Sequence, residues 1–186
     1  MSAREKILQR LSDRRRPPAV KPGLPDPLGR SDDLISSFAE ALKAAGGESN
    51  LLNDPADLGP MLARSFPETK EILDTRRPPA PGTEVDSRRS WDLAILEGQL
   101  GVAENGAVWV EWPESYPRSV LTLAERLVLI LPRTALVATM QEAYERLDLS
   151  ALSYGLFLAG PSKTADIEQA LVIGAHGAIG LQVFWV

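Results

Sequence analysis

Apolar positions near the start of the chain repeat with helical spacing, three and four residues apart. The first dozen residues are expected to form a short amphipathic helix with the stripe Ile7, Leu8 and Leu11. Residues 15–30 hold five prolines and two glycines, so this stretch is expected to be an extended arm. A second helix should follow, with Ser31 as its N-cap and the Gly46-Gly47 pair at its end.

Later in the chain, short apolar runs predict strands. Residues 93–96 are apolar at every position, as a strand covered on both faces of a parallel sheet requires. Strands are expected within residues 70–75, 91–98, 106–112, 126–132, 135–140, 154–160 and 180–186. Helices are expected around 58–62 and over 141–147 and 165–173. Alternating strands and helices indicate an α/β fold, a three-layer sandwich around a largely parallel sheet, with a hairpin or a short insertion near Glu104 within it.

The composition agrees with one globular domain over residues 1–186, the helix and arm forming 1–30 and the core 31–186. A net charge of −5 argues against a nucleic-acid partner. With no cysteine and one histidine, the chain is expected to hold no metal or iron–sulfur cofactor. No apolar run approaches the ~20 residues that span a bilayer, and the start lacks a secretory apolar region, so a cytoplasmic protein is expected.

The segment "LAGPSKTADIEQAL" is expected to run from a strand through a turn into a helix beginning near Thr164. Such a turn exposes backbone N–H groups to an anion, with Ser162, Lys163 and Thr164 as further donors. Asp166 with Gln169 also fits an ordinary capping box, and that structural interpretation is the simpler one for these two residues. In open α/β sheets, ligands usually bind beyond the carboxyl ends of the strands.

Two further segments carry candidate chemistry. The lone histidine, His176, lies in a glycine-rich turn, where a structural hydrogen bond is commoner than catalysis. In "GVAENGAVWV", Glu104 is either the charged tip of a hairpin turn or a working carboxylate. Trp109 and Trp112 cannot share a strand face, which suggests one core residue and one lid or interface residue. Arg118 and Arg126 are candidates for facing an anion, with a surface position as the default interpretation.

Together these segments resemble a known family. "GPSKTADIEQALVIGAHG" resembles the pattern G-P-S-x-T-[AS]-D-I-E-x-x-x-V-x-G-x-H-G of the lactate-utilisation protein C family, the LUD domain family. "GVAENGA" resembles that family's G-I-A-E-T-G-T segment, and the "SAREKIL" and "FAEALKAAGGE" helices also fit. The match is weak over residues 48–90.

The resemblance implies a fold of the NagB/RpiA/CoA-transferase-like superfamily. It implies an accessory subunit of a bacterial L-lactate oxidation system, beside partner proteins that carry the iron–sulfur clusters. The candidate ligand-binding residues are Gly101, Glu104, Asn105, Gly106, Gly160, Pro161, Ser162, Lys163, Thr164, Asp166, His176 and Gly177. Relative to the family pattern, the chain departs at Asn105, Ala107, Ala135 and Ala178, where hydroxyls, an imidazole and a proline are replaced.

Two other functions remain open from the sequence. "AENG" is similar to the S-E-N-G signature of coenzyme-A transferases, in which Glu104 would be the catalytic nucleophile; a related alternative is a sugar-phosphate-isomerase-like enzyme. The third is a non-catalytic binder of a phosphate or another small anion. The N-terminal helix must also bury its stripe, either on its own core or on a neighbouring copy in a homo-oligomer.

Overall fold

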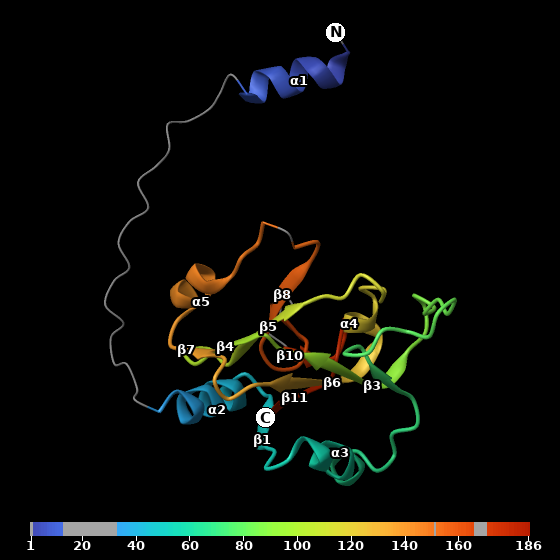
Figure 1. The fold of residues 1–186 in the computed structure, drawn as a ribbon, viewed down its shortest axis with the longest axis vertical. Coiled ribbons are helices and arrows are strands. Elements are labelled where there is room, and N and C mark those ends of the chain that lie inside the picture. The colour runs from blue at the N-terminus through green and yellow to red at the C-terminus, as the bar shows by residue number, and fades with distance from the viewer. Residues whose placement is uncertain (1, 13–32, 151, 166–170) are drawn as a thin grey trace.

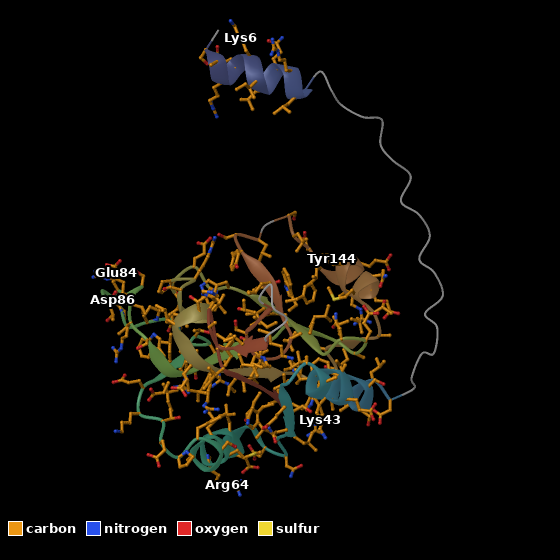
Figure 2. All side chains as sticks on the ribbon, turned by 180° about the vertical axis from the view of Figure 1, so that it is seen from behind. Lys6, Lys43, Arg64, Glu84, Asp86 and Tyr144 are labelled. Carbon is orange, nitrogen blue, oxygen red and sulfur yellow. The ribbon has the colours of Figure 1, made fainter. Side chains whose placement is uncertain are left out.

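The computed structural model describes residues 2–12, 33–150, 152–165 and 171–186 (Figure 1). The expected N-terminal helix is confirmed as α1 (Ala3–Ser12). Figures 1 and 2 show α1 apart from the rest of the molecule. Its stripe is open to solvent, since Ile7, Leu8 and Leu11 are 59%, 51% and 63% exposed. The expected arm, residues 15–30, lies outside the described residues.

The second helix, α2 (Leu34–Ala44), is capped by Asp33 and not by Ser31 as expected. The Asp33 carboxylate accepts a hydrogen bond of 3.0 Å from the Ser36 N–H, which satisfies a free donor of the first turn. The helix ends as expected at Gly46, whose φ of +89° suits glycine. Phe38 and Leu42 are fully buried, so this helix packs firmly on the core.

A five-stranded parallel sheet forms the centre of the fold. Its order is β1-β11-β6-β3-β2, and every neighbouring pair is parallel. These strands are β1 (Glu48–Leu51), β11 (Gly180–Trp185), β6 (Ala124–Leu131), β3 (Trp91–Glu97) and β2 (Ile72–Asp74). In β3 the side chains from Leu93 to Leu96 are all buried, which confirms that both faces of this sheet are covered.

A second, four-stranded sheet has the order β7-β4-β5-β8. It consists of β7 (Leu136–Val137), β4 (Leu100–Val102), β5 (Ala107–Glu111) and β8 (Gly155–Leu158). The hairpin near Glu104 is confirmed as the antiparallel β4–β5 pair. Its expected place within the parallel sheet is wrong, as is that of the strand at 154–160, because β8 pairs antiparallel with β5. An apolar run does not specify which strand it will pair with, so this partition was not visible in the pattern.

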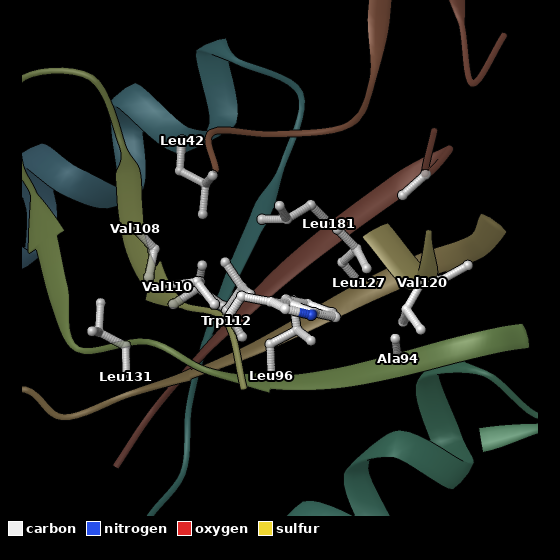
Figure 3. Close-up of a cluster of buried hydrophobic side chains, with 14 of the residues drawn as sticks. Leu42, Ala94, Leu96, Val108, Val110, Trp112, Val120, Leu127, Leu131 and Leu181 are labelled. Atoms are coloured by element: carbon white, nitrogen blue, oxygen red, sulfur yellow. The ribbon is translucent and has the colours of Figure 1, made fainter. Parts of the chain in front are cut away.

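Three apolar clusters fill the spaces between the layers. The largest lies between the two sheets and includes Leu96, Leu127 and Val110 (Figure 3). A second lies between the parallel sheet and α3 (Leu58–Ser65), which follows a short 3₁₀ turn (Pro55–Asp57). A third lies between the second sheet and α5 (Met140–Arg146). Figure 1 shows α3 on one side of the parallel sheet and the second sheet with α5 on the other, and a short helix α4 (Val120–Leu123) leads into β6.

The expected helix over 165–173 is wrong at both of its described ends. β9 (Lys163–Ala165) and β10 (Leu171–Ile173) form an antiparallel pair, in which Val172 faces Thr164 across the ladder. Asp166, Gln169 and their capping box lie outside the described residues. β-branched residues such as Thr164, Val172 and Ile173 favour strands, and their pairing outweighs a weak helical spacing.

Candidate functional site

A cleft of about 600 Å³ lies where the loop after β8 meets the loop before β11. The Ser162 N–H donates to the Ala178 carbonyl at 2.8 Å, and the Gly174 N–H donates to the Ser162 carbonyl at 2.9 Å. A Cβ on Gly177 would lie 3.0 Å from the Ser162 Cβ, so a side chain there would require the two segments to shift slightly apart. The "GPS" segment that ends at Ser162 and the "GAHG" segment that contains His176 are therefore neighbours in space.

The lining of the cleft consists of an apolar floor and a few polar groups. Leu127 is buried, and Leu121, Leu156 and Leu158 are half-buried against the inter-sheet core. The polar groups come from α4 and from loops around it, β8 and β11, and are Arg118, Ser119, Thr122, Tyr154, Ser162 and His176. This mixture is typical of small-molecule sites, in which apolar surface gives affinity and a few polar groups fix orientation.

Arg118 and Tyr154 form one end of the cleft. The guanidinium carbon of Arg118 lies 4.1 Å from the centroid of the Tyr154 ring, a cation–π contact. This stacking holds the arginine against the molecule and leaves its N–H groups able to bind an anion. The sequence left Arg118 as a surface arginine or one that faces an anion, and its side chain is exposed and lines the cleft. Tyr154 was missed, because the contact depends on the β5–β8 pairing that follows Tyr154 directly.

The cleft lies at the opposite edge of the parallel sheet from the one expected. Ala178 and Leu121 stand just before the amino ends of β11 and β6, in whose register Gly180 pairs with Arg126. The expectation of a site beyond the carboxyl ends assumed that the strand before Gly160 belongs to the parallel sheet. Because that strand is β8 of the second sheet, its loop instead meets the amino ends of β6 and β11.

Glu104 does not line this cleft. Its side chain is exposed, and Oε1 accepts a hydrogen bond of 2.8 Å from the Met140 N–H, in the first turn of α5. The same turn is capped by Thr139, whose Oγ1 accepts from the Glu142 N–H at 3.2 Å. A carboxylate at this position satisfies a free donor and complements the positive end of the helix. The contact gives Glu104 a structural role in joining the hairpin to α5.

The other predicted residues of the hairpin are also explained by packing. Asn105 closes an Asx turn, its Oδ1 accepting from the Ala107 N–H at 3.0 Å. Gly106 has a φ of +67°, and a Cβ there would lie 2.4 Å from the backbone nitrogen of Leu42. A Cβ on Gly101 would lie 2.7 Å from Leu136 Cδ2. These residues shape a tight turn against α2.

The end of α2 contacts both predicted loops. Gly160 has a φ of +73°, and a Cβ there would lie 2.4 Å from the Ala45 carbonyl oxygen. Gly106 approaches Leu42 in the same way, and three residues of helix rise by only about 4.5 Å. Lys163 also reaches this helix end, its Nζ 3.4 Å from where a Gly46 Cβ would lie. The structure thus brings the two loops onto one helix turn, although the Glu104 side chain points to α5.

The predicted site residues therefore divide into three groups. Gly160, Pro161, Ser162, His176 and Gly177 line the cleft. Gly101, Glu104, Asn105 and Gly106 belong to the hairpin, and Lys163 and Thr164 to β9, whereas Asp166 is outside the described residues. The expected anion site at a helix N-terminus is not formed by Lys163 and Thr164, since both lie in a strand.

Three further findings bear on the chemistry. Within the described ranges, no group of three His, Asp or Glu side chains could hold a metal ion. No helix in that part of the chain has the length and apolarity needed to cross a membrane. Trp109 and Trp112 are both buried, in different clusters on the two faces of the second sheet, so the expected lid or interface tryptophan is wrong.

Comparison with known proteins gives concordant results. The LUD domain family model matches residues 86–186, which include the whole cleft. Lactate utilization protein C of Shouchella clausii is 29% identical over 159 residues, covering 80% of this chain and 67% of that protein. Its namesake in Halalkalibacterium halodurans is 34% identical over 101 residues, covering 51% of this chain and 44% of that protein. The chain thus matches from under half to two thirds of the length of these relatives.

A solved structure supports the fold. The crystal structure of a DUF162 family protein from Deinococcus radiodurans superposes with a TM-score of 0.60, over 82% of this chain and 96% of that one. The two sequences are 15% identical, so the likeness concerns the fold alone, an α/β architecture around a parallel sheet.

Proposed function

Because the chain belongs to the LUD domain family, we propose that it is a component of a bacterial L-lactate utilisation system. Its role is that of a cytoplasmic accessory subunit, which binds a small carboxylate in the cleft beside partner proteins that carry iron–sulfur clusters. The observation that supports this most directly is that the family match contains every residue of the cleft, while the matched curated relatives are named for lactate utilisation.

The cleft suits a short-chain carboxylate. The Arg118 guanidinium and the Ser162 hydroxyl supply donors of the kind that bind carboxylate oxygens, and His176 also lines the cleft. The leucine floor accepts the carbon part of the ligand. A small hydroxy acid such as lactate, or the keto acid it becomes, has both features.

The partner proteins follow from the redox chemistry. Oxidation of lactate to pyruvate releases two electrons and two protons, and the 186 residues contain no cysteine thiolate that could ligate an iron–sulfur cluster. Clusters that accept these electrons would be ligated by another chain. In this proposal the present chain positions the substrate or organises the assembly.

Growth of the native bacterium tests the role in the cell. Deletion of the gene is expected to abolish or slow growth on L-lactate while leaving growth on glucose unchanged. Purification of the tagged chain from lactate-grown cells should recover proteins with bound iron and acid-labile sulfide. Normal growth of the deletion strain on lactate, with no iron-containing protein recovered, would overturn the proposal.

Ligand binding is tested separately on the purified chain. Titration calorimetry with L-lactate and pyruvate should show saturable binding that Arg118→Gln weakens by about tenfold, as loss of a charged hydrogen bond of ~1.4 kcal/mol would. Arg88→Gln is the matched control, because Arg88 is a solvent-exposed arginine that pairs with Asp86 outside the cleft. Equal effects of the two substitutions would place the ligand elsewhere.

A further inference from the structure

A second concavity lies on the opposite side of the parallel sheet, between α3 and the edge strand β2. It has a volume of about 480 Å³, within the range of small-molecule sites. None of its lining residues contributes to the cleft described above. It is therefore independent of the function proposed for that cleft.

The floor of this α3–β2 groove is apolar. Leu62, Leu93 and Ile95 are 7%, 0% and 5% exposed and belong to the cluster that joins α3 to the sheet. At the edge, Ile72 remains 48% exposed although it lies in a strand. A hydrocarbon chain in the groove would cover Ile72, and burial of apolar surface is favourable by about 25 cal/mol per Å².

Two arginines line the mouth of the groove, and one of them is held by a carboxylate. The Asp74 carboxylate accepts two hydrogen bonds from the Arg76 side chain, 2.8 Å from Nε and 2.6 Å from Nη2. This fork fixes the Arg76 guanidinium, whose remaining nitrogen is free of that carboxylate. Arg77 also lines the groove, and no ion pair is formed by it within the described residues. Asp74 pairs with Arg76, and the charge of Glu97 at the end of β3 also acts on that arginine, so Arg77 is the group at the mouth that is available to bind an anion.

The backbone near this mouth is also fixed. The Tyr116 hydroxyl donates to the Arg77 carbonyl at 2.5 Å, and the buried Thr75 hydroxyl donates to the Ile95 carbonyl at 3.0 Å. Both bonds tie the segment after β2 to the core of the molecule. The two arginines thus extend from an anchored stretch of chain at the carboxyl end of a parallel strand, the edge at which open α/β sheets usually bind ligands.

We infer that the α3–β2 groove is a second ligand site, for a monoanionic amphiphile that has a carboxylate at one end and a short hydrocarbon chain. The carboxylate binds at Arg77, beside the fixed Arg76, and the chain lies over Ile72 between α3 and the sheet. A medium-chain acyl carboxylate has this chemistry. The assignment of an anion rests on the Arg77 guanidinium at the mouth, and the assignment of a hydrocarbon chain rests on the apolar floor.

The test uses the full purified chain with hexanoate and octanoate as probes, followed by ¹H–¹⁵N correlation spectra. Shifts are expected for amides of residues 58–66 and 72–77, with octanoate binding more tightly than hexanoate. Acetate, which has the charge without the chain, and hexanol, which has the chain without the charge, should each bind at least tenfold more weakly than hexanoate.

Three variants complete the test. Arg77→Gln should weaken octanoate binding about tenfold, whereas Arg64→Gln, on α3 outside the groove, should leave it unchanged. Ala63→Phe places a ring in the groove from an exposed position of α3, so it should block binding while the protein stays folded. Equal binding of hexanol and hexanoate, equal effects of the two arginine variants, or shifts confined to residues 160–178 would overturn the inference.

Discussion

At the scale of single residues, Gly106 is the position in the hairpin where a side chain fits least well. Its φ of +67° disfavours any side chain, and the Leu42 backbone fills the place of a Cβ. Gly106→Ala is expected to lower the free energy of unfolding by about 2–5 kcal/mol, measured by urea denaturation. Gly82→Ala is the control, because Gly82 has a similar φ of +77° with no atom within 4 Å, and should cost roughly 1–2 kcal/mol. Equal losses would mean that the contact with α2 is unimportant.

Glu104 gives a second prediction, which separates a capping role from a catalytic one. Glu104→Gln keeps an oxygen acceptor for the Met140 N–H but removes the charge at the start of α5. The expected loss of stability is about 0.3–1 kcal/mol, screened by salt. Glu111→Gln, at the exposed end of β5, is the control for removing one negative charge.

The same residue can be tested chemically. After incubation with acetyl-CoA, mass spectrometry of the Glu104 peptide is expected to show no acyl adduct, since this carboxylate is hydrogen-bonded to α5 and lies outside the cleft. A Glu104 adduct that forms and turns over would instead support the coenzyme-A-transferase alternative.

Asp74 provides a prediction about pH. Partial burial raises the pKa of this carboxyl, but the hydrogen bonds and positive charge of Arg76 outweigh burial and bring the pKa below its usual value of 3.8. A lowered folded-state pKa stabilises the protein above the unfolded-state value, and that stabilisation is lost as pH falls through the folded-state value. Asp74→Asn should therefore destabilise the protein at pH 7 and by less at pH 2–3.

Urea denaturation at pH 7, 5 and 3 measures this dependence. Arg76→Gln should also abolish most of this pH dependence of stability, because the substitution removes the partner that lowers the pKa of Asp74. The double variant should then cost less than the sum of the two single variants. A stability difference between Asp74→Asn and the parent that is the same at all three pH values would contradict the assignment.

At the scale of elements, the sequence predicted the helices and strands whose type is set by the residue spacing within one segment. The spacing that buries Phe38 and Leu42 is set within α2, and the apolar run of β3 is long enough to identify a covered strand. Leu171–Ile173 is different, because three apolar residues fit a helix or a strand equally well. Pairing with Lys163–Ala165 decides between them, and spacing along the chain does not encode such pairing.

Element α1 yields a prediction about association. Its stripe of Ile7, Leu8 and Leu11 is more than half exposed, and its polar positions include Arg4, Lys6 and Arg10. Exposed apolar side chains at helical spacing contribute little to the stability of the body but favour contacts with other molecules. Deletion of residues 1–12 is therefore expected to leave the melting temperature unchanged within about 2 °C, or about half a kcal/mol for a domain of this size.

Analytical ultracentrifugation then shows whether the stripe serves self-association. If the parent chain is oligomeric, the deletion and the milder Leu8→Glu variant should both shift it toward the monomer. Lys6→Gln is the control on the polar positions of α1. A clear loss of thermal stability on deletion would show instead that α1 packs on its own core.

At the scale of the whole molecule, the site was predictable only as a set of segments. The motifs around Ser162 and His176 were found from sequence and do line one cleft. The part played by Glu104 was not, because its partner Met140 lies 36 residues further along the chain. Arg118 was named from the sequence, but its contact with Tyr154 was not predictable, since that contact depends on the second sheet that β8 joins. Turn residues can be recognised in the sequence, whereas the direction in which each turn faces depends on how the sheets and helices pack around it.

The helix end that contacts both glycine loops has a consequence for recombining this protein with its relatives. Leu42 and Ala45 leave room only for a bare backbone at Gly106 and Gly160, so these three segments fit as one unit. A chimera that exchanges the hairpin alone sets a foreign turn against the native helix. Exchange of residues 34–47, 100–111 and 155–163 together keeps each complementary surface with its partner. Chimeras with all three segments from one parent are expected to be recovered folded more often than those with mixed parentage.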